Sequence, residues 1–364
     1  MTSTSSPIPV TFSGSYEGTY LNSDQLEVIS ITDIISSSAS ILGCISILVF
    51  AIYKNKVCHQ SVQPLFHLAM ADFCASASLL ASCVVHVLYR TRSDEVFTLC
   101  SYLNGCVTGF FVITFFLTAA YAAEVYMRVS FQDKQRTGRG LDPVRRTQFE
   151  FMYLMYSMSW VIPLAVVITM VGYYATFHQE TAQKDIHTYC NDSCLPFFSQ
   201  NNFRVCGSQS QSMFKWLRIY KYLFLVPLLL SFAFNSVIYV KTVSLLRKSF
   251  RQAGKMSSEE NKRLTRVKKN AILFLSIFFI CWLPTVLIGI ISSVEGDGMD
   301  MNRYYPLYIC QALLSPLQGL LNTLGYGWQR REFKLLMCPR FPSVCQCVQG
   351  RRGEHETSAN MLLS

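Results

Sequence analysis

The sequence predicts an all-α membrane protein: a seven-transmembrane helix bundle followed by a short amphipathic eighth helix. Of its 364 residues, 51% are hydrophobic and only 15% are charged, which is too apolar for one soluble domain. Seven apolar runs exceed the length of about 20 residues that crosses a membrane. They show few of the polar faces expected of helices in a large soluble core. The runs are Leu26–Tyr53, Val62–Tyr89, Phe97–Met127, Phe149–Phe177, Trp216–Leu246, Ala271–Ser292 and Tyr304–Gly327.

Positive charge alternates between the loops and sets the expected orientation, because cytoplasmic loops collect Lys and Arg. The first loop holds Lys54 and Lys56, five basic residues follow in the third, nine lie in Arg247–Lys269, and six follow the last run. The first 25 residues hold none. We therefore expect a multi-pass protein of the plasma membrane with an extracellular N-terminal tail (1–25), the bundle (26–327), a surface helix (328–338) and a cytoplasmic tail (339–364).

Two features mark the second outer loop. Asn191-Asp192-Ser193 is an acceptor triplet for N-glycosylation, which fits an extracellular loop. Only cysteines on the oxidising side should form disulfides. We expect a bridge that ties this loop over the end of the bundle, and spacing does not choose its partner: it joins Cys100 to one of Cys190, Cys194 and Cys206.

Asp72 lies in the middle of the second run, within the segment LAMADF. An ionisable side chain is costly inside a membrane and is a functional candidate by default. One interpretation is a water or ion site, with sodium as the candidate ion. The alternative is a polar contact that only joins helices, through a hydrogen bond with Thr114 or Asn322.

The sixth run contains CWLP, Cys281 to Pro284. A proline ring removes one backbone hydrogen bond and clashes with the preceding turn, so the helix bends there. Pro284 is thus a candidate hinge, at which the helix swings when a ligand moves Trp282. A kinked packing helix with no switching role is the alternative.

The chain leaves the membrane after Asn322-Thr-Leu-Gly-Tyr326. Beyond it, Trp328–Cys338 has an apolar face and three basic residues, as expected of a helix lying among anionic lipid headgroups. Cysteines close to the inner membrane surface are candidates for palmitoylation. They are Cys338, Cys345 and Cys347.

These motifs resemble the G-protein-coupled receptor superfamily over nearly all seven runs, and each matches in part. The resemblance implies sodium binding at Asp72, a switch at Trp282, and a tyrosine, Tyr326, that rotates inward on activation. The superfamily has a proline after the asparagine of the last motif. Thr323 stands there instead, so we expect a straighter helix.

The segment Glu124-Val125-Tyr126 resembles the acid, Arg, Tyr triplet that ends the third helix in these receptors. Val125 replaces the arginine that meets the G protein. Arg128 lies nearly one turn lower and about 60° round the helix, and stands in imperfectly. The resemblance places Glu124, Tyr126 and Arg128 towards a transducer, and a heterotrimeric G protein is the candidate partner.

Two longer stretches, QALLSPLQGLLNTLGYGW and VQPLFHLAMADF, look like the orphan family of transmembrane protein 116, which is related to the cyclic-AMP-receptor-like group. No ligand comes with that resemblance. The sequence shows no acid on the third run at ligand depth, which argues against a simple amine. Asp33 is expected at the outer boundary of the first run, where water reaches it.

We therefore predict an orphan receptor in which an unknown extracellular ligand shifts an inward-facing helical switch. The alternative is a receptor-shaped scaffold that binds partners without activating G proteins. An enzyme is not expected, because the six histidines are scattered rather than clustered as metal ligands. Neither a cofactor nor nucleic acid is expected, and lipid is the surrounding partner.

Overall fold

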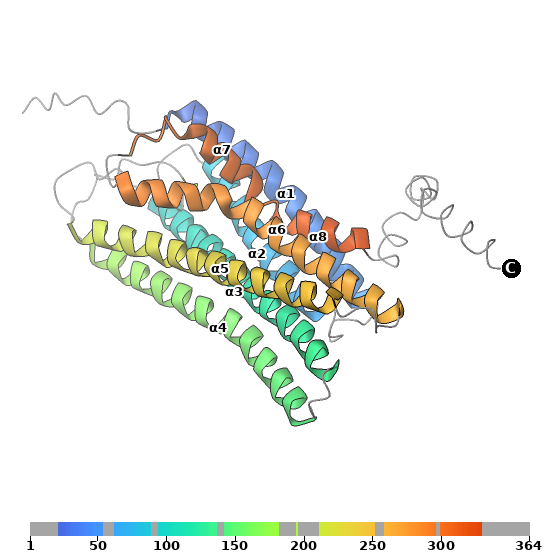
Figure 1. Cartoon of the computed structure of the whole chain (residues 1–364). Coiled ribbons are helices and arrows are strands. Elements are labelled where there is room, and N and C mark those ends of the chain that lie inside the picture. Colours follow the sequence, from blue (N-terminus) through green and yellow to red (C-terminus); the bar gives the residue numbers. More distant parts are fainter. Residues whose placement is uncertain are drawn as a thin grey trace, which may run out of the picture.

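The computed structural model is a bundle of long α-helices (Figure 1). It describes residues 21–53, 62–88, 94–136, 142–181, 194–195, 211–251, 258–295 and 299–329, and no strand occurs in these ranges. The helices are α1 (Ser23–Tyr53), α2 (Gln63–Leu88), α3 (Asp94–Arg136), α4 (Asp142–Thr181), α5 (Gln211–Arg251), α6 (Ser258–Glu295), α7 (Tyr305–Leu314) and α8 (Gln318–Gln329).

Within the described ranges, α1 to α6 each contain a stretch long and apolar enough to cross a membrane, six in all. They correspond to the first six predicted runs, so the chain is an integral, multi-pass membrane protein. The seventh run is divided. It forms the 10-residue α7 and the 12-residue α8, with a turn at Ser315–Leu317 between them.

Pro316 explains the division between α7 and α8. A proline has no N–H, so the carbonyl four residues earlier, that of Ala312, loses its helical partner. The hydroxyl of Ser36 on α1 donates to this carbonyl over 2.8 Å instead. The helix continues without a break through Thr323, but the run is broken seven residues earlier, a division that was not expected from the sequence.

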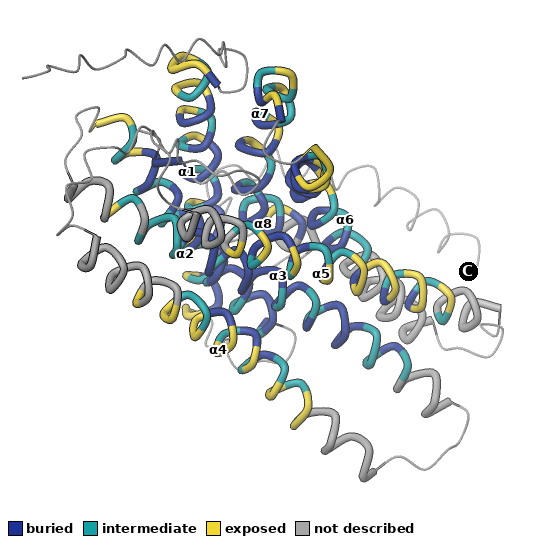
Figure 2. The backbone as a smooth tube through the Cα atoms, turned by 90° about the vertical axis from the view of Figure 1, so that its left-hand side faces the viewer, coloured by how far each residue is buried: buried dark blue, intermediate teal, exposed yellow. Residues whose placement is uncertain are grey.

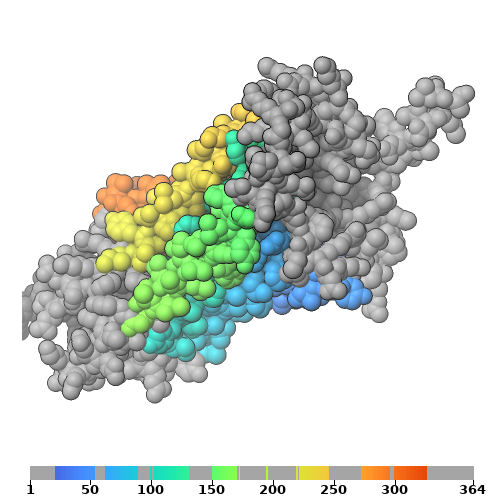
Figure 3. Space-filling model, turned by 90° about the horizontal axis from the view of Figure 1, so that it is seen from below, coloured from blue at the N-terminus to red at the C-terminus, as the bar shows by residue number. Residues whose placement is uncertain are grey.

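The helices differ in how far they face the outside of the bundle. α3 lies at the centre and contacts α2, α4, α5 and α6, and 72% of its apolar span is buried. Only 17% of the α4 span is buried, so its apolar side chains line the outside (Figures 2 and 3). An apolar exterior over a buried polar interior suits a bundle surrounded by lipid.

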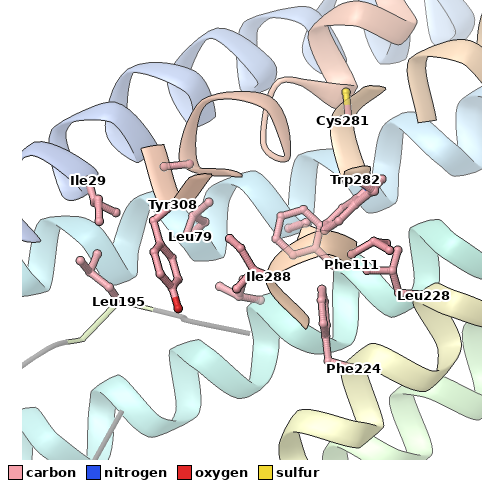
Figure 4. Packing of buried hydrophobic residues seen from close by; sticks show 14 of the residues in the cluster. Ile29, Leu79, Phe111, Leu195, Phe224, Leu228, Cys281, Trp282, Ile288 and Tyr308 are labelled. Carbon is pink, nitrogen blue, oxygen red and sulfur yellow. The ribbon is translucent and has the colours of Figure 1, made fainter. Parts of the chain in front are cut away.

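The main hydrophobic core lies between α1, α2, α3, α5, α6 and α7. Figure 4 shows two groups of side chains within it. Trp282 of α6 lies with aromatic and aliphatic residues of α3 and α5, whereas Tyr308 of α7 lies near Ile29, Leu79 and Leu195. The second group is nearer the end of the bundle that carries the disulfide Cys100–Cys194, called the disulfide end below.

Candidate functional site

Asp72 of α2 is 4% exposed and accepts hydrogen bonds from two side chains of α8. The Nδ2 atom of Asn322 lies 3.1 Å from Oδ2, and Nε2 of Gln318 lies 3.5 Å from Oδ1. Asn322 and Gln318 are four residues apart, so both point from the same face of α8. The carboxylate therefore joins α2 to the second half of the divided seventh run.

Glycines allow α8 to come this close to α1 and α2. A Cβ atom added at Gly319 would lie 2.5 Å from both Cys44 Sγ and Ser40 Oγ, and 3.2 Å from the Cβ of Asp72. On the opposing helix, a Cβ added at Gly43 would lie 2.8 Å from the Cα of Leu320. Close backbone approach of this kind is a regular use of small residues in membrane bundles.

Gln318 extends the polar contact to the sixth helix. Its side-chain oxygen accepts a hydrogen bond from the indole N–H of Trp282, which is fully buried. The indole is surrounded by rings whose centroids lie 4.9 Å (Phe111), 4.6 Å (Phe115) and 6.0 Å (Phe224) away. A polar chain thus runs from α6 through α8 to α2, two residues from the hinge candidate Pro284, which lies inside α6.

The structure differs from the sequence prediction at two residues of this region, and the prediction for a third concerns a side chain outside the described part of the chain. Gln318 was missed, although it lies one turn before Asn322 in the quoted motif. Thr114 was expected beside Asp72, but its hydroxyl donates to the carbonyl of Phe111 in its own helix over 2.8 Å. The backbone of Tyr326 belongs to α8, and its side chain is outside the described part of the chain.

Glu124 of α3 is buried rather than presented at the surface as predicted. Its carboxylate pairs with Arg128 one turn on, and accepts a hydrogen bond from the hydroxyl of Tyr156 on α4 over 2.7 Å. Val125 is only 6% exposed, and Tyr126 is half-buried against α5 and α6. The side chain of Arg128 is 36% exposed, compared with 10% for that of Glu124.

At the disulfide end, Cys194 is the partner that Cys100 selects. The hydroxyl of Ser82 donates to the carbonyl of Cys194, and the Cys194 N–H donates to Nδ1 of His86 over 3.3 Å. The next residue, Leu195, is 1% exposed and belongs to the main core. The loop predicted to cover the bundle is thus fixed to α2 and α3 at this point.

Asp33 is the residue whose setting differs most from the prediction. It was expected at a boundary reached by water, but it is 7% exposed and lines a cavity inside the bundle. The helix face that carries it, which includes Ser36, Ser37 and Ser40, is turned inward. These small polar residues recur every three or four positions on one helix face, and in an apolar run such a face can be turned either to the interior or to water.

Several predicted sites lie outside the described residues. They are Asn191, Cys190, Cys206, Cys338, Cys345 and Cys347, together with most of the surface helix 328–338. Within the described ranges, no group of three His, Cys, Asp or Glu side chains is placed to hold a metal ion.

A multi-pass helical bundle with a buried polar chain and a loop fixed over one end is the architecture of a receptor-like membrane protein. The chain belongs to the Transmembrane protein 116 family, whose family model matches residues 26–341. This agrees with the resemblance seen in its longer motifs.

Curated relatives are receptor-like as well. Cyclic AMP receptor-like protein A of Dictyostelium discoideum is 26% identical over 180 residues, 48% of this chain and 44% of the relative. Protein C of the same group and organism is 22% identical over 282 residues, 73% and 63% of the two chains. Neuropeptide Y receptor type 6 of Mus musculus is 24% identical over 184 residues, 49% and 46%. The chain thus spans from under half to just under two thirds of these relatives.

Proposed function

We propose that this protein is a seven-span signalling receptor of the G-protein-coupled type. In this proposal α7 and α8 together make the seventh crossing, the N-terminus and the disulfide end are extracellular, and an extracellular ligand acts on the bundle. The observation that carries it is the polar chain Trp282–Gln318–Asp72–Asn322. It gives a movement of α6 a direct route to α8 and α2.

The proposed switch depends on two prolines in the helices that the polar chain joins. Pro284 bends α6 just beyond Trp282, and Pro316 divides the seventh run just before Gln318. A ligand that displaces the indole would break or remake the bond to Gln318 and change the angle between these segments. It shifts the equilibrium only as far as its affinities for the two conformations differ.

Coupling to a G protein is the finer part of the proposal. Val125 is buried where the superfamily has its arginine, while Arg128 is partly exposed and held by Glu124. Release of Arg128 from Glu124 would offer a positive charge to a transducer. A scaffold that binds partners without activating G proteins is the second candidate, and it is favoured by the absence of an arginine at 125.

The test compares wild type, Gln318→Leu and Val125→Arg at matched surface expression. Each is read with G-protein dissociation sensors and with a fluorophore placed near Ser258 at the start of α6. Loss of the Gln318 bonds, worth about 1–2 kcal/mol, should change the conformational equilibrium about 5-fold or more. The fluorophore signal should change in Gln318→Leu, and at least one sensor should respond to Val125→Arg.

The outcomes separate the two candidates. A fluorophore that responds while all sensors stay silent would favour the scaffold, because the switch would exist without coupling. If neither readout differs from wild type in either variant, the polar chain does not control the shape of the bundle and the receptor proposal fails.

A further inference from the structure

A second buried carboxylate, that of Asp33, lies in a cavity at the disulfide end. The cavity is lined from α1, α2, α3 and α7 and by Leu195 of the fixed loop. The cavity volume is about 20 Å³, which is enough to hold one water molecule. The space therefore suits a group of roughly that size.

Two side chains whose acceptor oxygens are unpaired in the described part of the chain, those of Asp33 and Gln311, line this cavity beside the hydroxyl groups of Tyr308 and Ser315. Asp33 supplies a carboxylate, and within the described residues no hydrogen-bond donor or cation is paired with it. Gln311 of α7 lines the same cavity, is 7% exposed, and its side-chain oxygen has no hydrogen-bond partner among those residues. Ser315 is already engaged, since its hydroxyl bonds the carbonyl of Cys281 and lies 3.1 Å from Thr285 Oγ1.

The rest of the wall is apolar and aromatic. Phe111 and Tyr308 contribute rings, and Ile29, Leu79 and Leu195 contribute aliphatic surface (Figure 4). Aromatic faces attract cations, and do so more strongly where water is excluded. Among the described residues, the unpartnered acceptors in this cavity lack hydrogen-bond donors and a positive charge, and a cation with several N–H groups would supply both.

We propose that Asp33 and Gln311 bind the ammonium group of a small organic cation. An ammonium group is about as large as a water molecule, donates several hydrogen bonds and neutralises the carboxylate. Water would fill the space and supply hydrogen bonds, but only a cation would also stabilise the ionised form of this buried carboxyl group. A sodium ion needs a shell of oxygens, whereas most of this wall is hydrocarbon.

The acid that the third run lacks at ligand depth is thus provided by the first helix. The proposal concerns binding alone. It holds whether or not the protein activates a G protein. The side chains that bind the cation in this proposal are not members of the polar chain around Asp72.

The test uses the purified full chain in detergent, with thermal unfolding followed by a thiol-reactive dye. The buried free cysteines Cys44, Cys83 and Cys281 become reactive on unfolding. Methylammonium chloride is titrated against equal concentrations of sodium and potassium chloride. Bound ligand stabilises the folded state, so saturating methylammonium should raise the unfolding midpoint of wild type by about 2–4 °C beyond either salt.

Three variants locate the binding. Asp33→Asn should abolish the methylammonium shift, and Gln311→Leu should weaken binding about 10-fold, because it removes a hydrogen bond to a charged group. Asp24→Asn removes an exposed acid from the same helix and should keep the full shift. If Asp33→Asn does not fold, Gln311→Leu still tests the site.

Two results would overturn the proposal. One is a methylammonium shift of equal size in wild type, Asp33→Asn and Gln311→Leu. The other is a sodium shift in wild type that equals or exceeds the methylammonium shift, since the site would then not select an ammonium group.

Discussion

Asp72 and Asp33 are both carboxylates buried within the helical bundle, and they differ in what surrounds them. Asp72 accepts hydrogen bonds from Asn322 and Gln318, and its neighbourhood is packed closely enough to need a glycine at 319. Asp33 faces a cavity with the unpartnered oxygen of Gln311.

The difference shows how a buried aspartate can have two different roles in one bundle. A carboxylate whose oxygens accept hydrogen bonds from side chains of another helix joins the two helices. Its replacement therefore changes how those helices pack and the angle between them. A carboxylate that faces a cavity remains able to bind a ligand that the protein itself does not supply. We expect Asp72 to respond to changes in α8 and Asp33 to changes at the disulfide end.

The largest effect should come from removing the disulfide. Replacing Cys100 and Cys194 together by Ser should lower the free energy of unfolding by about 2–4 kcal/mol, because the unfolded chain gains freedom and the loop is released. Leu195 would then no longer be held over the cavity, and methylammonium binding at Asp33 should weaken. Thermal unfolding with and without methylammonium measures both.

Cys310→Ser is the matched control, because Cys310 is a free, exposed cysteine and should unfold like wild type. The proposed difference between the two carboxylates would be contradicted if methylammonium raised the unfolding midpoint of the double variant as much as that of wild type. The fixed loop would then have no part in forming the Asp33 cavity.

The next effect should come from Gly319, which sets the packing around Asp72. Gly319→Val adds side-chain carbons where Cys44, Ser40 and Asp72 already meet the helix. Overpacking of this kind lowers stability by about 1–3 kcal/mol. We expect a lower unfolding midpoint, and a G-protein or fluorophore response that differs from wild type because α8 is displaced.

Gly172→Val provides the control for that change. Gly172 is exposed on α4 and has nothing within 4 Å of an added Cβ. Equal unfolding midpoints for the two valine variants would mean that the close contact of α8 with α1 and α2 does not limit packing.

The sequence predicted those features that depend on long patterns or on an unusual residue in a uniform background. Six apolar helices followed from hydropathy, although several of them extend well beyond the predicted apolar runs, and Asp72 was evident as an acid in an apolar run. Trp282 and Asn322 were found from motifs and do belong to one polar chain. The disulfide could be reduced to three partners, but the choice of Cys194 depends on where the loop crosses the bundle.

Other features depend on which face a helix turns inward, and that is set by packing. Asp33 lies near the start of a run, a place where acids usually reach water, so its burial could not be read from position. Gln318 was passed over because an amide in an apolar run carries no charge to mark it. The seventh run was expected to be straighter because Thr323 replaces a proline, and the effect of Pro316, seven residues earlier, was not considered.

The smallest effect should come from Ser36 of α1, whose hydroxyl donates a hydrogen bond to the end of α7. Its hydroxyl is the substitute donor for the Ala312 carbonyl that Pro316 leaves without a helical partner. Ser36→Ala should therefore lower the free energy of unfolding by about 0.5–1.5 kcal/mol. Because α7 carries Gln311, methylammonium binding should also weaken slightly.

Ser46→Ala is the control, since Ser46 is only half-buried and its hydroxyl donates to the carbonyl of Leu42 in its own helix. That carbonyl keeps its backbone partner, so stability should change little. If Ser36→Ala is as stable as Ser46→Ala, the division of the seventh run does not need a donor from α1. The position of Gln311 beside Asp33 would then have to be fixed by side-chain packing alone.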